Sequence, residues 1–233
     1  MAANAHLPQT LLALEAAGAS CSVAVWHDGV VLVEDTRAMQ RGQSEQLVPM
    51  VQRAMGHARI PWQSLDAIAV TSGPGGFTGV RIGLAAAQGL ALAWDLPVIT
   101  LSCFDAVRAS LPPDEPGLRW LLMLIEAKRA EVYVQLCKPD GALHLGPVLI
   151  GEQDLVQALP AEPFLLAGDA ATARVVSLRA AGLDIRLSQA PTPLSAAVVA
   201  RLAAQRPLPA RPWPLPAPLY LRGADTTLAK AKR

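Results

Sequence analysis

The chain has 233 residues, of which 52% are hydrophobic and 17% are charged, and its formal net charge is +1. A typical soluble domain carries about 25% charged residues, so this chain has enough apolar side chains for a sizeable core and for an apolar surface patch as well. Proteins that bind nucleic acid unaided usually have a basic face, whereas Lys and Arg form a run here only at residues 230–233. The composition therefore favours a protein partner over direct RNA binding.

Sorting signals and cysteine usage indicate where the protein works. The first ten residues have neither a basic flank nor an apolar core, so no signal peptide is expected. No apolar run reaches the roughly 18 residues of a membrane span. Cys21, Cys103 and Cys137 form no metal-ligand pattern, and Cys21 and Cys137 fall in strand-like runs, where we expect buried free thiols. These features predict a cytoplasmic protein without membrane contact.

Before residue 105, the hydrophobic pattern predicts a mixed α/β lobe. Asp28-Gly29 lies between two strand-like runs and is a hairpin signal, and Ser44 is the expected cap of the first helix. Three antiparallel strands followed by alternating helices and strands are typical of a mixed sheet that helices cover. The expected strands are residues 11–15, 20–26, 30–36, 66–71 and 97–101, and the expected helices are residues 44–55 and 79–94.

The stretch from residue 118 to residue 150 repeats the opening pattern of the chain. Residues 122–126 end in a glutamate followed by an alanine, as the first strand does, and Asp140-Gly141 follows close to the place of the earlier Asp-Gly pair. Chance similarity is the alternative, because strand–turn–strand patterns are common, but the combination favours a duplicated lobe. Helices are expected near residues 153–159, 170–182 and 194–205.

A duplicated lobe that opens with a β-meander and carries a carboxylate at its first turn resembles the actin, Hsp70 and sugar-kinase class, in which a nucleotide lies between the lobes. The sequence thus predicts an α/β protein with a duplicated actin-like ATPase (ASKHA, ribonuclease H-like) fold, each lobe having a mixed sheet flanked by helices. We expect an N-terminal lobe at residues 1–105 with the partner-binding helices, a C-terminal lobe at 106–206 and a proline-rich tail at 207–233.

Six prolines between residues 207 and 218 predict an extended segment without internal hydrogen bonds. Such a segment could be an exposed ligand for another protein or a tail laid back over the fold. The second interpretation is favoured, because Leu219, Tyr220 and Leu221 follow the prolines and need burial.

The strongest local signal is the glycine-rich segment 72–81, in which a strand leads through a glycine-rich turn into a helix. This geometry suits an anion, but glycines also serve where backbones approach closely, and both interpretations stay open. Glu15 and Glu126 could face each other across a cleft and hold Mg²⁺ and phosphate, although ordinary strand-end charges are the favoured interpretation. The candidate anion or nucleotide contacts are Glu15, Gly75, Gly76, Thr78, Arg81 and Glu126.

Two helices of the first lobe indicate a partner. The helix at residues 79–94 carries no charge after Arg81, and it is apolar nearly all round, whereas one apolar stripe is enough to cover a sheet. The earlier helix has a broad apolar face with two methionines, which are common on adaptable surfaces. Packing inside the lobe is the alternative. We expect a partner-binding patch formed by Leu47, Met50, Val51, Met55, Gly79, Val80, Gly83, Leu84, Ala87, Leu90 and Ala91.

Motifs for catalysis and metal binding are missing from the sequence. The four histidines include no pair at i, i+4 spacing, so no His-Glu-x-x-His occurs, and there is no Gly-x-Ser-x-Gly elbow. We therefore expect no catalytic residue, no metal site and no peptidase activity in this chain.

Residues 73–81 (GPGGFTGVR), continued by residues 82–83 and 87–91, closely resemble the bacterial TsaB (YeaZ) family, the dimerisation subunits of the tRNA threonylcarbamoyltransferase complex. The similarity extends to residues 44–50, 131–133 and 219–222, and residues 151–218 carry little of it. The chain departs from the family pattern at cleft-like positions, where Glu15-Ala16 replaces Asp-Thr, Gln43 replaces His, and Glu126-Ala127-Lys128 replaces Asp-Ala-Arg.

The resemblance implies a non-catalytic partner subunit in threonylcarbamoylation of the tRNA adenosine beside the anticodon. It implies binding to a TsaD-like catalytic subunit together with a TsaE-like ATPase, a homodimer when the partner is absent, and contact with tRNA only through the complex. ATP and metal are then expected on the partner subunits, with no cofactor of this chain's own. The alternative is an ATP-binding enzyme of the sugar-kinase class that uses Glu15, Thr78 and Glu126.

Overall fold

The computed structural model describes residues 6–115 and 117–221, and for residues 128 and 129 it describes the backbone alone. Half of the N-terminal stretch expected to lack a signal peptide (residues 1–5) lies outside the described residues, as do Arg222 and the basic residues 230–233. The proline-rich tail is therefore described only as far as residue 221.

The first sheet contains β1 (Thr10–Glu15), β2 (Ser20–His27), β3 (Val30–Ala38), β4 (Ala67–Thr71) and β5 (Val98–Leu101), in the order β3-β2-β1-β4-β5. The first three strands are antiparallel, and β4 and β5 run parallel to β1. Asp28 and Gly29 both have positive φ, of 43° and 87°, as a two-residue hairpin turn requires. The expected meander is confirmed.

The second sheet repeats this arrangement. It contains β6 (Trp120–Arg129), β7 (Glu131–Cys137), β8 (Leu143–Gly151), β9 (Phe164–Ala167) and β10 (Ile185–Leu187), in the order β10-β9-β6-β7-β8. Here β6, β7 and β8 are antiparallel, and β9 and β10 run parallel to β6. Because each strand of the second sheet has a counterpart at the same position in the first, the duplication and the expected fold class are confirmed.

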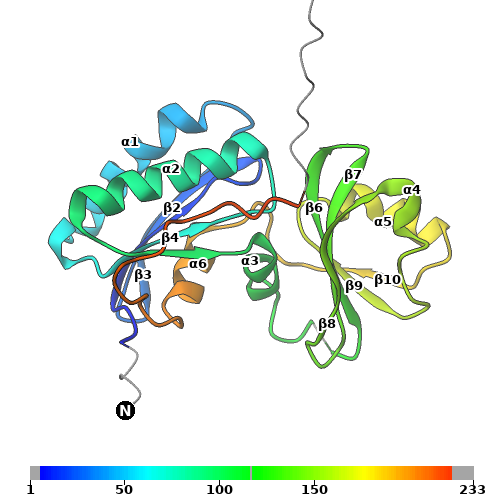
Figure 1. Ribbon diagram of the computed structural model, residues 1–233. Coiled ribbons are helices and arrows are strands. Elements are labelled where there is room, and N and C mark those ends of the chain that lie inside the picture. Colours follow the sequence, from blue (N-terminus) through cyan, green and yellow to red (C-terminus); the bar gives the residue numbers. More distant parts are fainter. Residues whose placement is uncertain (1–5, 116, 222–233) are drawn as a thin grey trace, which may run out of the picture.

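Helices cover both faces of the first sheet (Figure 1). On one face lie α1 (Gln43–Ala58) and α2 (Phe77–Trp94), and on the other lies α6 (Ala196–Ala203). Alternate residues of β1 serve the two layers, since Leu12 and Leu14 pack toward α1 and α2 while Leu11 and Ala13 pack toward α6. A short 3-10 turn (Trp62–Ser64) precedes β4.

A third helix joins the two lobes. Helix α3 (Cys103–Ala109) lies between the sheets in Figure 1, and its Phe104 and Val107 belong to the same hydrophobic cluster as Met123 and Ile125 of β6. The opposite face of the second sheet is covered by α4 (Glu152–Leu155) and α5 (Ala171–Ala180). The sequence pattern did not predict α3, whose apolar residues occupy fewer than two turns.

The structure differs from the sequence-based expectation at three places. Ser44, the expected cap, lies inside α1, which begins after the N-cap residue Gly42, and α2 begins two residues before its expected start, after Gly76. Helix α6, which was expected in the C-terminal lobe, packs instead on the first sheet. Its buried small residues lie against the face of that sheet opposite α1 and α2. The lobe boundaries at residues 105 and 206 otherwise stay a prediction.

Two further expectations concern the cysteines and the length of the apolar helices. Cys21, Cys103 and Cys137 are all described, and each is a free, buried thiol, as expected for the first and third. In residues 6–115 and 117–221, no helix has both the length and the apolar composition to cross a bilayer.

Candidate partner-binding face and interlobe cleft

The glycine-rich turn packs directly on the turn between β1 and β2. A Cβ atom at Gly75 would lie 2.6 Å from the carbonyl oxygen of Ala17, and one at Gly79 would collide with that of Ala16. The Gly76 N–H donates to the Ala17 carbonyl at 2.7 Å. The close approach of the two backbones therefore explains why glycine is needed here. Of the two interpretations of this segment, it supports close backbone approach.

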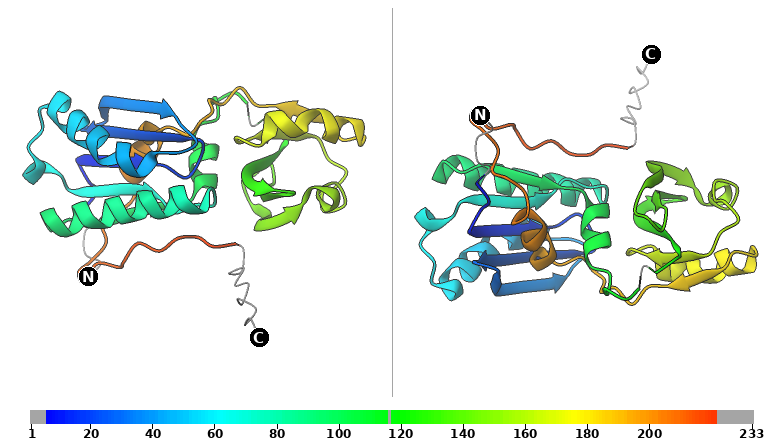
Figure 2. Two further views of the ribbon diagram at one scale, coloured as in Figure 1. Left: turned by 90° about the horizontal axis from the view of Figure 1, so that it is seen from above. Right: turned by 90° about the horizontal axis from the view of Figure 1, so that it is seen from below.

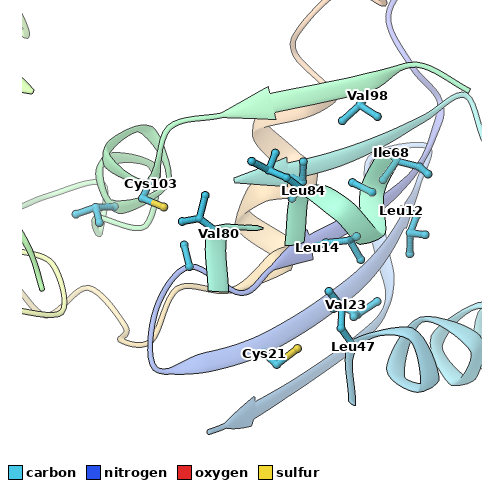
Figure 3. Packing of buried hydrophobic residues seen from close by; sticks show 14 of the residues in the cluster. Leu12, Leu14, Cys21, Val23, Leu47, Ile68, Val80, Leu84, Val98 and Cys103 are labelled. Atoms are coloured by element: carbon cyan, nitrogen blue, oxygen red, sulfur yellow. The ribbon is translucent and has the colours of Figure 1, made fainter. Parts of the chain in front are cut away.

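The residues expected to meet a partner face the protein's own interior. Val80 and Leu84 of α2 lie against the first sheet near Leu14 (Figure 3), and Ala87 is 0% exposed. Leu90 is half-buried and packs on the same cluster. The chain itself buries the other expected residues as well, namely Leu47, Met50, Val51, Met55, Gly79, Gly83 and Ala91. In the chain by itself these side chains pack inward, and their role in binding a partner stays a prediction.

The outward side of α2 is nevertheless apolar. Its exposed residues are Phe77, Thr78, Arg81, Ala85, Gln88, Gly89, Leu92 and Ala93. Within this helix, every residue of which is described, Arg81 is the single charged side chain. The neighbouring α1 exposes polar residues instead, such as Glu45 and Arg53, with Val48 among them. The sequence thus predicted the excess of apolar residues on α2 but not the side that carries it.

The proline-rich tail lies along α2, on the side away from α1 (Figure 2). Near the end of the helix Arg211 donates to Asp95 at 2.6 Å, and near its start the Leu219 N–H donates to the Ser72 carbonyl at 2.8 Å. The Arg81 guanidinium lies 3.7 Å from the ring centre of Phe77 and donates to the Tyr220 hydroxyl at 2.8 Å. The expectation of a tail laid back over the fold is confirmed for residues up to 221.

Glu15, a candidate nucleotide contact, lies at the end of β1 and is completely buried. Its carboxylate accepts hydrogen bonds from the Ala17 N–H at 2.7 Å, the Gly18 N–H at 3.3 Å and the Thr71 hydroxyl. Burial raises the pKa of Glu15 above its ordinary value, an effect that these hydrogen bonds reduce. The side chain holds the turn between β1 and β2 and is occupied by its own lobe.

Asp169, which follows β9, is the acidic residue that sequence reasoning missed in the cleft between the lobes. It accepts a hydrogen bond from the Glu126 N–H at 2.9 Å, and its other oxygen lies 3.8 Å from the Cβ position of Gly18 in the first lobe. Burial raises the pKa of Asp169, and the Glu126 carboxylate adds to this effect. The Gly-Asp pair directly after an apolar strand was the signal that could have revealed it.

Glu126, the other predicted acidic contact, turns toward the second lobe. Its carboxylate accepts a hydrogen bond from Arg174 of α5 at 3.1 Å, and Arg174 also pairs with Glu152. Glu15 and Glu126 thus each have hydrogen-bond partners within their own lobe. Thr78 and Arg81 are exposed on α2, where Arg81 holds the tail.

A small cavity separates the lobes where α3, Gly18 and Asp169 meet. Its walls are mainly apolar, and the space open to the centre of a water molecule is about 20 Å³. A volume of this size holds about one water molecule. Within the described residues, no group of three or more His, Cys, Asp and Glu side chains is placed to hold a metal ion.

Two sheets of identical strand order, each built from a meander followed by parallel strands, define the actin-like ATPase class of folds. A family model described as "TsaD: tRNA N6-adenosine threonylcarbamoyltransferase" matches residues 36–144. The tRNA threonylcarbamoyladenosine biosynthesis protein TsaB of Escherichia coli is 37% identical over 123 residues, which are 53% of this chain and 52% of that protein. The chain belongs to the TsaB (YeaZ) family.

The chain spans about half the length of the curated TsaB proteins it matches. The similarity to solved structures covers most of the chain. The protein titled "YeaZ from Pseudomonas aeruginosa" is 25% identical, with a TM-score of 0.68 over 91% of this chain and 100% of that chain. A second Pseudomonas aeruginosa structure, titled as an uncharacterized protein with similarity to peptidase YEAZ, is 26% identical with a TM-score of 0.71, over 92% of this chain and 100% of that chain. An uncharacterized Mycobacterium bovis protein, Mb3455c, is 33% identical over 63% of this chain and 67% of that protein.

Proposed function

We propose that this chain is a non-catalytic, cytoplasmic subunit in the synthesis of threonylcarbamoyladenosine in tRNA. It binds a TsaD-like catalytic subunit, which transfers the threonylcarbamoyl group to the adenosine beside the anticodon, and works together with a TsaE-like ATPase. Membership in the TsaB family supports the pathway, because its E. coli and Haemophilus influenzae members are named for this biosynthesis. Contact with tRNA is made through the complex.

The apolar outward side of α2 is the observation that carries this proposal. Its inward side is already buried against the first sheet, whereas Phe77 and Leu92 remain 58% and 86% exposed. Small exposed residues of the same helix, Ala85, Gly89 and Ala93, allow the backbone of another helix to approach closely. When the partner is absent, the same surface pairs with a second copy of the chain.

ATP and metal belong to the partner subunits in this proposal. Two features support this division of labour: Glu15 is occupied by hydrogen bonds within its own lobe, and the cavity between the lobes has room for about one water molecule. The chain then contributes a surface and a folded scaffold, while the chemistry takes place on the catalytic subunit.

The test is binding of the purified chain to the TsaD subunit encoded in the same genome, measured by calorimetry with an Ala85→Glu variant. We expect this change to abolish binding and to lower threonylcarbamoyladenosine in tRNA when it replaces the chromosomal copy. Ala173→Glu, on the exposed side of α5, is the matched control and should bind normally. Normal binding by both variants would show that the partner surface lies elsewhere.

An ATP-binding enzyme of the sugar-kinase class is the second candidate, because Glu15 and Asp169 place two carboxyl groups near the cleft between the lobes. This candidate predicts that the isolated chain binds ATP with Mg²⁺ at micromolar concentration and that Asp169→Asn removes the binding. Absence of binding in the isolated chain, with activity only in the complex, would reject it.

A further inference from the structure

The proline-rich tail and α2 expose apolar side chains side by side. At the end of the helix, Leu92 and Leu215 line the same hollow, and they are 86% and 76% exposed. At its start, the rings of Phe77 and Tyr220 stack with their centres 6.0 Å apart. The tail residues between these points are prolines, Ala217 and Leu219, and this part of the tail lies along the helix (Figure 2).

Contacts at both ends hold this part of the tail in place. Arg211 pairs with Asp95, Tyr220 accepts a hydrogen bond from Arg81, and the backbone of Leu219 bonds to that of Ser72. An extended proline-rich segment also has little conformational entropy left to lose. A ligand that docks on the tail therefore meets a surface that is already ordered, which lowers the cost of binding.

The distribution of charge shows what kind of partner fits. Ionised side chains lie only near the ends of the strip within the described residues, where Arg81 marks one end and the Asp95–Arg211 pair the other. A nucleic-acid site would need several cations along its length. On the other flank of α2, the outward side of α1 is polar. The apolar surface of α2 therefore continues onto the tail rather than onto α1.

We propose that residues 213–220 and the outward side of α2 form one docking surface for the transferase subunit, a proposal that rests on the function given above. The family model that matches residues 36–144, a range that includes α1 and α2, is that of the transferase itself. The transferase family thus resembles this chain over the range that carries both helices, and the hollow between Leu92 and Leu215 offers apolar side chains to an apolar segment of that partner. The tail is part of the interface, and not merely a cover for the fold.

Three point variants of the full chain test this proposal by calorimetric titration with the TsaD subunit of the same genome. Leu215→Glu changes the tail, Leu92→Glu changes α2, and Val176→Glu changes an equally exposed residue of α5, which is 74% exposed. We expect the first two variants to bind more than about tenfold more weakly and the third to bind normally. All three should keep the melting temperature of the unmodified chain, because the replaced side chains contribute little to the core.

The outcomes separate this proposal from the function on which it rests. Weak binding by Leu92→Glu with normal binding by Leu215→Glu would overturn the role of the tail and leave the partner function intact. Failure of the unmodified chain to bind the transferase would overturn both. Loss of self-association in Leu215→Glu without a change in transferase binding would make a second copy the occupant, and loss of salt-sensitive tRNA binding would make RNA the occupant.

A measurement on the unmodified complex does not depend on how the variants fold. Backbone amide hydrogen exchange is compared for the chain alone and for the chain with the transferase. Slower exchange in the non-proline residues of 213–221 as well as in α2 supports the proposal, whereas slower exchange in α2 alone contradicts it.

Discussion

Glu15 is a buried carboxylate whose hydrogen bonds hold a turn of the first lobe. It accepts hydrogen bonds from Ala17, Gly18 and Thr71, and it has no exposed surface. Burial raises the pKa of its carboxyl group above 4.5, so the folded chain binds this proton more tightly than the unfolded chain does. Stability is therefore lost as the pH rises from about the unfolded value through the raised folded value.

Glu15→Gln should remove this loss. The amide can still accept from Ala17 and can donate to the Thr71 hydroxyl, so we expect the variant to be at least as stable as the parent at pH 7, with an advantage that shrinks toward pH 4. Urea unfolding at several pH values checks this. A stability difference between variant and parent that does not change with pH would contradict the raised pKa of Glu15. The pH dependence that remains in the variant is expected to come from Asp169, whose pKa is also raised.

Ala85 and Ala87 separate the two sides of α2. Ala87 is 0% exposed against the first sheet, whereas Ala85 faces solvent. Ala87→Arg places an unpaired charge in the core, and we expect a loss of at least about 3 kcal/mol in the free energy of unfolding. Ala85→Arg should change it by less than about 0.5 kcal/mol. Denaturant melts of both variants decide this, and equal losses would mean that the orientation of the helix is different.

At the level of the element, two glycines of α2 have opposite roles. A side chain at Gly79 would collide with the Ala16 carbonyl, while nothing lies within 4 Å of the Cβ position of Gly89. Gly89→Ala should stabilise the chain by about 0.5–1 kcal/mol, because alanine is the better helix former. Gly79→Ala should destabilise it by about 1–3 kcal/mol through overpacking. Thermal melts check both signs, and a stabilising Gly79→Ala would refute the close approach.

Which elements could be predicted from the sequence depends on how local their signals are. The meander and its Asp28-Gly29 turn were predictable, because alternation and turn chemistry act over a few residues. The orientation of α2 was not, since a helix that is apolar nearly all round leaves its rotation undefined. Helix α3 was missed because it is short, and Asp169 was missed because its role depends on contact with the other lobe.

At the scale of the whole molecule, α6, which follows the whole second sheet in the sequence, packs on the first strand of the chain. Its residues Ala196, Val199 and Ala203 are buried with Leu11 and Ala13 of β1. Ending the chain at residue 190 would uncover that face of the first sheet, and we expect loss of cooperative unfolding and precipitation. Ending it at residue 206 keeps α6, and the product should stay folded. Circular dichroism melts compare the two, and a folded product from the shorter chain would contradict the role of α6.

The position of α6 also sets the order in which the halves of the protein can be completed during synthesis. The second sheet comes from the uninterrupted stretch of β6 to β10, whereas the first sheet must wait for a helix that leaves the ribosome after all of them. The half of the molecule that is translated first is consequently the half that is finished last.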